Sequence, residues 1–319
     1  MNKKMYFAAF AAALALMGCS KNDLSSETVS PAEDERTVEL TVNVMDSMME
    51  TKLTGSGNDK LVNTLQVFVF NKHGILETSA NAESSEVTLT CTAGQKHVVA
   101  LANAQAESGV TTLADLSARK AGLETTSPTN CVMVGETDHN IVKSGGLSIA
   151  VTRLTSMVGL KSVELAFQSA YLKTLPFEIK AVYLINVAGE KAYISDSTPG
   201  VWYNQGGYDE STGLGILYDA VTGGTLVSGG EKYDKDHYFY CYPNTTSTPT
   251  RLVIEAEIDS ETYYYPIEVK DIQSNNKYMY DVKIKGLGKD SPDILLTPTD
   301  LKNLVSVDLW VDNTFSVDL

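Results

Sequence analysis

The chain has 319 residues, with 40 acidic against 25 basic side chains and a formal net charge of −15 at pH 7. This balance disfavours nucleic acid as a partner, because a phosphate backbone has to be neutralised by lysine and arginine. An acidic surface instead suits a well-solvated protein. The length is sufficient for two ordinary domains.

The first residues of the chain have the features of an export signal. Lys3 and Lys4 precede the apolar run MYFAAFAAALALMG, which is too short to span a membrane stably and is typical of a signal peptide. The run ends in LMGC, where small Gly18 precedes Cys19, a pattern similar to a bacterial lipobox. We therefore predict a lipoprotein signal peptide over residues 1–18 and lipidation of Cys19, with palmitate among the acyl groups.

A strand pattern follows the polar tether that begins at Cys19. In RTVELTVNVMDSMMETK, apolar residues alternate with polar ones, the period of a strand that buries one face. The apolar residues of this alternation are Val38, Leu40, Val42 and Val44. A basic residue stands at each end of the stretch, Arg36 and Lys52, and each offers a bond that a trypsin-like protease cuts.

Strand patterns dominate the rest of the chain, and turn residues between them favour all-β sandwiches. The expected strands lie within residues 61–70, 84–104, 145–167, 176–194, 237–244, 250–258, 262–269 and 278–288. The best helix candidate is TTLADLSARKAGL, residues 111–123, and the Gly- and Tyr-rich region 195–230 suggests a long, partly helical excursion. We expect a domain boundary near Thr152, which divides residues 53–152 from residues 153–319.

The remaining cysteines show neither CxxC spacing nor a nearby histidine, so no disulfide framework is indicated. They are Cys91, Cys131 and Cys241. Cys91 is in phase with Val87 and Leu89 and is best explained as a small buried hydrophobe, although a Cys91–Cys131 bridge stays open.

The last residues, LVSVDLWVDNTFSVDL, again alternate apolar with polar side chains. The apolar residues are Val305, Val307, Leu309, Val311, Phe315, Val317 and Leu319. SVDLWV at residues 306–311 matches TVELTV at residues 37–42 in its valine, acidic, leucine and valine positions. One interpretation is coincidence, since amphipathic strands resemble one another. The other is that two strands of similar design compete for one groove.

A shared groove has a physical consequence. A strand that fills it buries four apolar side chains at roughly 1.5–3 kcal/mol each and pairs backbone groups that otherwise stay unsatisfied. A chain that loses its N-terminal strand exposes an apolar slot and open sheet edges, which accept a strand from another chain. Because donor and groove lie on different parts of each molecule, repetition of the contact gives a filament.

A known family shares the order and spacing of several segments. They are LVNTLQVFVFNKHG, CTAGQKHVVALANA, VTRLTSMVGLKSVEL, YFYCYPNTT, TRLVIEAEID, YYYPIEV and NNKYMYDVKIKGLGKDSPD. Through these segments the chain resembles the fimbrillins, the structural subunits of the type V pili of Bacteroidales. The similarity covers most of the chain and is weakest over residues 195–230.

The resemblance implies an all-β fold of two tandem transthyretin-like β-sandwich domains with minor helical insertions. It implies a precursor anchored to the outer membrane by lipid, from which a surface trypsin-like protease removes residues 19–52. It further implies that residues 304–319 of another subunit then complete the first domain as a donor strand. The expected product is a cell-surface fimbrium, with other fimbrial subunits, in a homopolymer and as accessory tip and anchor proteins, as partners.

The cleavage residue differs from the family pattern. The family is usually cut after an arginine in the turn that follows the first strand, and the matching residue here is Lys52, so the protease has to accept lysine. Arg36 is the alternative. A cut after Arg36 leaves the strand of residues 37–45 attached to the folded chain, whereas a cut after Lys52 detaches it. We therefore predict Lys52 as the activating site.

The sequence does not indicate an enzyme. The four histidines are far apart, and no HExxH, GxSxG or P-loop pattern occurs, so we predict no catalytic residue, metal or cofactor. The acidic stretch GETDHN, residues 135–140, is typical of a solvated loop. YDKDH, residues 233–237, lacks the spacing of a calcium loop.

The alternative function is a pilus tip or anchor, or a free-standing surface lipoprotein that binds a glycan or a protein. A tip is expected to lack the C-terminal donor strand, which this sequence carries up to Leu319. An anchor is expected to keep its lipidated N-terminal segment uncut, and Lys52 argues against this.

Overall fold

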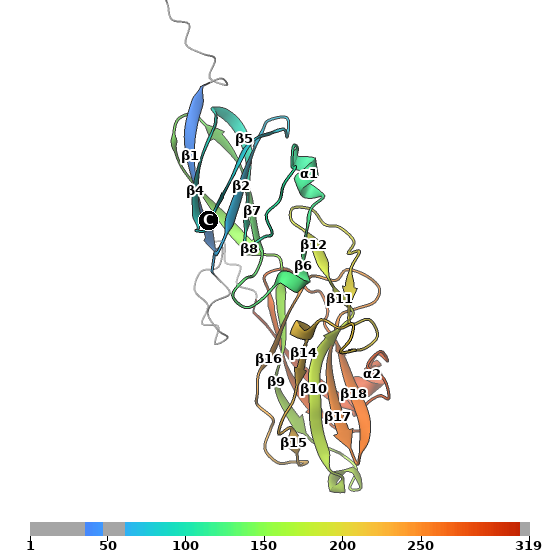
Figure 1. Ribbon diagram of the computed structural model, residues 1–319. Helices are drawn as coiled ribbons and strands as arrows, with labels where there is room; N and C mark the ends of the chain where they lie inside the picture. Colours follow the sequence, from blue (N-terminus) through green and yellow to red (C-terminus); the bar gives the residue numbers. More distant parts are fainter. Residues whose placement is uncertain (1–35, 47–60, 313–319) are drawn as a thin grey trace, which may run out of the picture.

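The structure is a computed structural model that describes residues 36–46 and 61–312, and strands make up most of it (Figure 1). The predicted all-β class is confirmed, since the helical segments are few and short. They are α1 (Leu113–Ser117), η2 (Leu123–Thr125), η3 (Leu172–Thr174), η4 (Gly215–Leu217) and α2 (Pro298–Asn303). Within the described ranges, none of these helices has the length and apolar character needed to cross a membrane.

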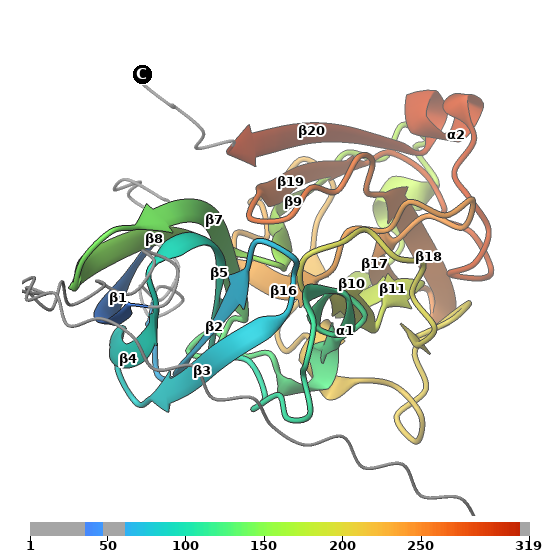
Figure 2. The ribbon, with the colours of Figure 1, turned by 90° about the horizontal axis from the view of Figure 1, so that it is seen from above.

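Seven strands from the first half of the chain form one sheet, which we term the N-terminal unit. They are β1 (Thr37–Asp46), β2 (Leu65–Asn71), β3 (Leu76–Ala82), β4 (Glu86–Thr92), β5 (Gly94–Ala102), β7 (Met133–Ile141) and β8 (Gly145–Arg153). Their order is β3-β2-β5-β7-β8-β1-β4, and β3 also contacts β4, so the sheet curls round on itself (Figure 2). β1 therefore lies inside the sheet, between β8 and β4.

The inner faces of these strands enclose an apolar core. The alternation in β4 shows why: Val87, Leu89 and Cys91 are buried, and the threonines between them are exposed. Other strands contribute to the same core in the same way, among them Val38, Leu40, Val42 and Val44 of β1, Val67 and Val69 of β2, and Ile149 and Val151 of β8.

The segment between β5 and β7 crosses the outer face of this sheet. It contains α1, which begins at a capping box between Thr112 and Asp115, and then β6 (Lys120–Gly122). The prediction of one helix over residues 111–123 is therefore wrong after Ser117. Residues 120–122 pair instead with a strand from the second half of the chain.

Two further sheets, which we term the C-terminal unit, face each other across a second core (Figure 1). Their orders are β16-β9-β19-β20 and β14-β10-β17-β18, with β15 pairing β10. The strands are β9 (Ser156–Leu165), β10 (Phe177–Ile185), β14 (Tyr218–Ala220), β15 (Thr225–Leu226), β16 (His237–Cys241), β17 (Arg251–Ile258), β18 (Glu261–Glu268), β19 (Lys277–Ile284) and β20 (Val305–Asp312). β20 forms an edge of its sheet (Figure 2).

The two units are joined by more than the chain itself. β6 pairs antiparallel with β12 (Glu190–Ala192) and so links the two halves of the chain. Within the second half, β11 (Val187–Ala188) pairs with β13 (Trp202–Tyr203). Buried residues from both units belong to one continuous apolar cluster. The units therefore share part of their core.

The boundary predicted near Thr152 falls close to the end of β8 at Arg153 and the start of β9 at Ser156. That boundary and the assignment of two transthyretin-like domains stay predictions. The region 195–230 contains short strands and little helix, only the 3₁₀ turn η4. No disulfide joins the three buried thiols of the described chain, Cys91, Cys131 and Cys241.

Candidate strand-exchange site

β1 fills a groove in the N-terminal unit. Its inward-facing apolar side chains are at most 4% exposed, and they are Val38, Leu40, Val42 and Val44. The residues between them face outward, where Thr41 Oγ1 lies 2.9 Å from Thr88 Oγ1 of β4. The alternation read from the sequence therefore corresponds to a real division between a buried and an outer face.

β1 forms two different hydrogen-bonded ladders. It pairs antiparallel with β4, with Val38 opposite Cys91, and parallel with β8, with Thr41 opposite Gly146. Since β4 and β8 bond to β1 and not to each other, loss of β1 leaves two open strand edges with an apolar slot between them.

Arg36 stands where β1 begins. Its guanidinium donates to the carbonyl of Val142, and its own carbonyl accepts from the Ala93 amide at 2.8 Å. A cavity of about 170 Å³ opens beside it, with Ala93, Ile141 and Val142 among the residues that line it. The backbone on either side of the Arg36–Thr37 bond is thus tied into the sheet.

β20 pairs antiparallel with β19 at the edge of the C-terminal unit, with Val305 opposite Ile284. Burial decreases along the strand. Val305 is 0% exposed, Val307 is partly buried and Leu309 is 43% exposed. β20 is therefore packed most tightly at its start.

α2 fixes the start of β20. Its N-terminus is closed by a capping box between Thr297 and Asp300, and Lys289 Nζ lies 2.8 Å from Asp300 Oδ2. The pKa of Asp300 is lowered to about 2. The largest cause is the hydrogen bond from Lys289, followed by the hydrogen bonds from Thr297. Leu304, which connects α2 to β20, accepts a hydrogen bond from the Lys285 amide at 2.8 Å.

The structure does not bring β1 and β20 together, since they belong to sheets in different units (Figure 2). Several predicted residues lie outside the described residues, namely Cys19, Lys52, Phe315, Val317 and Leu319. The side chain of Val311 is also outside them, although its backbone is part of β20. Sequence reasoning missed the groove walls, β4 and β8, although the alternation EVTLTC was a usable signal.

The prediction of a loop at residues 135–140 is wrong, because they belong to β7. Two of their carboxylates hold an imidazole of β5. His97 Nδ1 lies 2.8 Å from Asp138 Oδ1, and His97 Nε2 lies 3.2 Å from Glu136 Oε2. The contacts link β5 to β7 and are structural in character.

The acidic stretch at residues 233–237 also has a structural explanation. The Tyr233 hydroxyl lies 2.7 Å from His237 Nε2, and Asp219 Oδ2 lies 2.9 Å from His237 Nδ1. Both nitrogens of this buried imidazole are thus satisfied. The described residues contain no group of three or more side chains suited to hold a metal ion.

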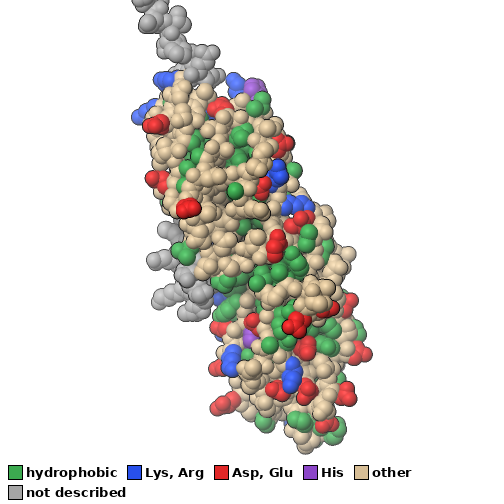
Figure 3. All heavy atoms as spheres, in the orientation of Figure 1, with side chains coloured by type: hydrophobic (Ala, Val, Ile, Leu, Met, Phe, Trp, Pro, Cys, Tyr) green, Lys and Arg blue, Asp and Glu red, His purple; other side chains and the backbone are tan. Residues whose placement is uncertain are grey.

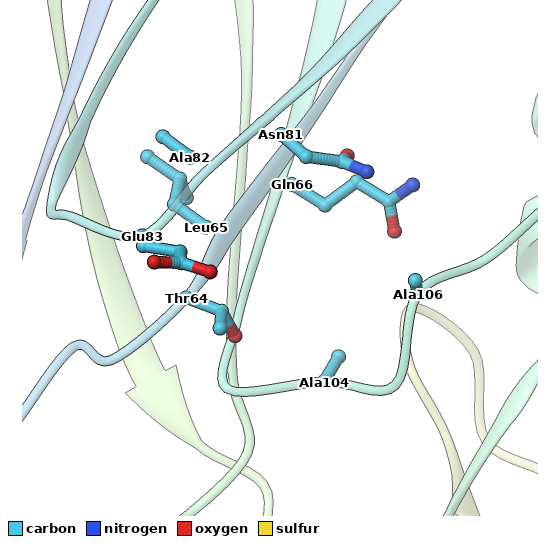
Figure 4. A pocket seen from close by; sticks show the side chains of 8 residues that line it. All are labelled: Thr64, Leu65, Gln66, Asn81, Ala82, Glu83, Ala104 and Ala106. Carbon is cyan, nitrogen blue, oxygen red and sulfur yellow. The ribbon is translucent and has the colours of Figure 1, made fainter.

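A pocket of about 410 Å³ lies where β2 begins, lined by residues such as Thr64, Ala82 and Ala104 (Figure 4). Its buried polar side chain is Gln66. The Gln66 amide donates to the Glu107 carbonyl at 2.9 Å and accepts from the Glu107 amide at 3.0 Å. These polar groups therefore serve to hold the loop after β5 on β2.

The inserted strand β1 in one unit and the edge strand β20 in the other place the chain among all-β proteins. Residues 37–162 match the family model of the major fimbrial subunit protein (FimA). The predicted resemblance to the fimbrillins is therefore confirmed.

Solved structures share the fold over most of the chain. A "putative cell adhesion protein" from Bacteroides eggerthii is 22% identical, with 87% of this chain and 96% of that chain covered and a TM-score of 0.67. A fimbrilin (FimA) from Porphyromonas gingivalis is 16% identical, with 86% and 96% covered and a TM-score of 0.64. The tip fimbrial protein Mfa3 of that species, with C-terminal truncation, is 12% identical, with 86% and 99% covered and a TM-score of 0.51.

The match to the major fimbrial subunit family over residues 37–162 supports a role as a non-enzymatic fimbrial subunit. Among curated proteins, none matches this chain.

Proposed function

We propose that the chain is a stalk subunit of a fimbria that is exported as a lipoprotein precursor and polymerises by donor-strand exchange. A surface trypsin-like protease removes the segment that contains β1. The C-terminal strand of a neighbouring subunit then takes the vacated groove. The observation that carries the proposal is the place of β1, which is buried between β4 and β8 and not at a sheet edge.

The magnitude of this burial explains why removal of β1 requires a replacement. Four groove side chains at roughly 1.5–3 kcal/mol each give roughly 6–12 kcal/mol, an upper estimate. That is comparable with the net stability of a whole domain, about 5–15 kcal/mol. A subunit that has lost β1 is therefore strongly driven to accept a new strand.

The environment of Arg36 supports Lys52 as the activating residue. The Arg36–Thr37 bond lies at the start of a strand that pairs with β4 from Thr37 and with β8 from Leu40. Proteolytic cuts concentrate in exposed loop tips and not in paired strands. A cut after Arg36 also leaves β1 covalently joined to the chain through residues 47–60.

Mild trypsin treatment of the purified precursor tests this proposal. We expect filaments by electron microscopy and a new N-terminus at Leu53. Lys52→Ala should block filament formation, and Arg36→Ala, its matched control, should not. Fibre subunits that begin at Thr37 would overturn the assignment of Lys52.

The lipid anchor is tested separately. In cells grown with labelled palmitate, we expect the label in the precursor and its loss in Cys19→Ala. The assembled fibre should carry no label, because the cleaved segment includes Cys19. Label in the subunits of mature fibres would contradict removal of residues 19–52.

A further inference from the structure

We propose that the donor strand enters the groove in one register, with Val305 in the place of Arg36, Leu309 in the place of Leu40 and Trp310 in the place of Thr41. This inference rests on the proposed strand exchange. It names the residues of donor and groove that select the partner strand.

The choice of register follows from the inward positions of β1. Four of these positions hold buried apolar residues, and Arg36, which is itself exposed, stands in the same phase one step before them. The proposed register puts Val305, Val307, Leu309, Val311 and Asn313 at these five positions. A shift by two residues puts Asn303, Val305, Val307, Leu309 and Val311 there. An asparagine thus falls either at the Val44 end or at the Arg36 end of the groove.

The Arg36 end of the groove favours a valine. Ala93 and Ile141, which line the 170 Å³ cavity there, are only 1% and 2% exposed. When Arg36 leaves with the cleaved segment, a valine in its place packs on Ala93 and Ile141. The Val142 carbonyl then loses its contact with Arg36, and the exposed residues Lys72, Gln95 and Asn140 line the outer side of the cavity. The shifted register also has to unwind the end of α2, because Asn303 is its last residue. The proposed register starts beyond α2, although it requires β20 to leave β19, where Val305 is 0% exposed and lies opposite Ile284.

The middle of the groove favours the same register. Leu40 is 2% exposed and Val42 is 0% exposed, so the core is closely packed around a leucine followed by a valine. The proposed register keeps that order with Leu309 and Val311. The shifted register exchanges the two side-chain sizes, which leaves a void at one position and overpacks the next.

The outer face of the groove gives another reason for the proposed register of the donor strand. Thr41 lies between Thr88 of β4 and Gly146 of β8. Gly146 is exposed, and a Cβ built on it would meet only the Thr41 carbonyl oxygen, at 3.8 Å. An aromatic side chain beside a glycine in a sheet covers the bare backbone of that glycine. Trp310 in this place gains a contact that Thr41 cannot make, which favours the donor strand over β1.

One position is mismatched in the proposed register, and this mismatch provides a test of the register. Asn313 takes the place of Val44, which is 4% exposed. A buried amide without a partner weakens binding, so Asn313→Val should slow release of the donor strand roughly tenfold. In the shifted register residue 313 lies beyond the place of Val44, and the same change should not slow release in this way.

Disulfide cross-linking between engineered cysteines identifies the register directly in fibres of the full chain. Donor subunits carry Trp310→Cys, and acceptor subunits carry Glu86→Cys, Thr88→Cys or Thr90→Cys, all in a Cys91→Ala background. Residues opposite each other in a sheet have Cβ atoms about 4.5–5.5 Å apart, against about 7–8 Å for diagonal neighbours. We expect mild oxidation to join Trp310→Cys to Thr88→Cys fastest.

A double-mutant cycle tests the tryptophan contact. Gly146→Val should leave the precursor folded, because nothing but Thr41 O lies near the new Cβ. It should slow fibre growth about two- to fivefold with Trp310 donors and not with Trp310→Thr donors. Ser148→Val, at the next outward position of β8, is the matched control and should act equally on both donors.

The outcomes separate this inference from the proposed function. Cross-linking at Thr88, with Asn313→Val fibres that dissociate more slowly, supports the register. Fastest cross-linking at Glu86 or Thr90, or none at the three positions in fibres that still form, overturns the register and leaves strand exchange standing. If unmodified trypsin-treated protein forms no fibre, the proposed function itself fails.

Discussion

Leu40 illustrates, at the level of one residue, how β1 can contribute to the stability of the precursor and not to that of the proposed fibre. Its side chain is 2% exposed in the core of the N-terminal unit. Leu40→Ala should therefore lower the free energy of unfolding of the precursor by about 2–5 kcal/mol in urea denaturation. Assembled fibres should keep their thermal stability, because the proposed cleavage after Lys52 removes this residue.

Thr41→Ala is the matched control for Leu40→Ala. Thr41 faces outward and contacts Thr88 at the surface, so its loss should change precursor stability by no more than about 0.5 kcal/mol. Fibres of the Leu40→Ala protein that melt earlier than unmodified fibres would show that β1 stays in the subunit after assembly.

Cys91 offers a chemical reporter of the groove. It lies opposite Val38 and is 5% exposed. The pKa of its thiol is raised, mainly by burial and then by the charge of Glu77. A maleimide should leave it unmodified in the precursor, label it after cleavage and release of β1, and leave it unmodified again in the fibre.

Cys241 is the internal control for the labelling of Cys91. It is 0% exposed in the C-terminal unit, and burial raises the pKa of its thiol to about 12, so it should stay unlabelled in all three states. Mass spectrometry of tryptic peptides identifies the labelled thiol. If Cys91 is equally unreactive before and after removal of β1, the groove does not open.

At the level of elements, α2 stabilises the start of β20. The carboxylate of Asp300 has a pKa near 2, below its ordinary value of 3.8, so it stabilises the folded form above about pH 4. This contribution is lost as the pH falls from about 4 to about 2. Asp300→Asn should remove it at neutral pH and increase hydrogen exchange at the Lys285 amide, which bonds to Leu304.

Asp115 provides the matched control at the other capping box. Its pKa is also about 2, owing to hydrogen bonds from Thr111 first and then Thr112. Asp115→Asn should loosen α1 in the N-terminal unit and leave exchange at Lys285 unchanged. Equal exchange at Lys285 in both variants and in the unmodified protein would show that α2 does not hold β20.

The elements also show what the sequence could and could not predict. Alternating strands such as β1, β4 and β20 were predictable, because period-2 burial is written directly into their residues. The acidic stretch at residues 135–140 was not, because its polar side chains carry no apolar alternation, and its strand state depends on pairing with β5. Residues 120–122 likewise form β6 and not the helix expected from the sequence, because distant residues of β12 pair with them.

The candidate site was predictable in part for the same reason. The two strands that we expect to exchange carry a local pattern, so the sequence located both of them. The walls of the groove come from β4 and β8, and only the sheet order shows that these two strands flank β1. A pairing between strands far apart in the chain leaves no local pattern in either one.

For the whole molecule, we expect the junction between the two units to govern the shape of the proposed fibre. Hydrophobic side chains gather near the middle of the molecule, where the units meet, while charged side chains of both signs are spread over the visible surface (Figure 3). The ion pair between Lys120 and Glu190 crosses this junction at 2.6 Å, with side chains 29% and 20% exposed. Leu123, 0% exposed, lies in the shared core there, and its amide donates to the Gly189 carbonyl.

The magnitudes predict which of these contacts keeps the units aligned. A partly exposed ion pair contributes up to about 1 kcal/mol, whereas truncation of a buried leucine to alanine costs about 2–5 kcal/mol. Leu123→Ala should therefore broaden the range of angles between the units in small-angle X-ray scattering and give more strongly curved fibres. Lys120→Ala should leave both close to those of the unmodified protein. Curved fibres from Lys120→Ala together with straight fibres from Leu123→Ala would mean that the ion pair, and not the shared apolar core, stiffens the subunit.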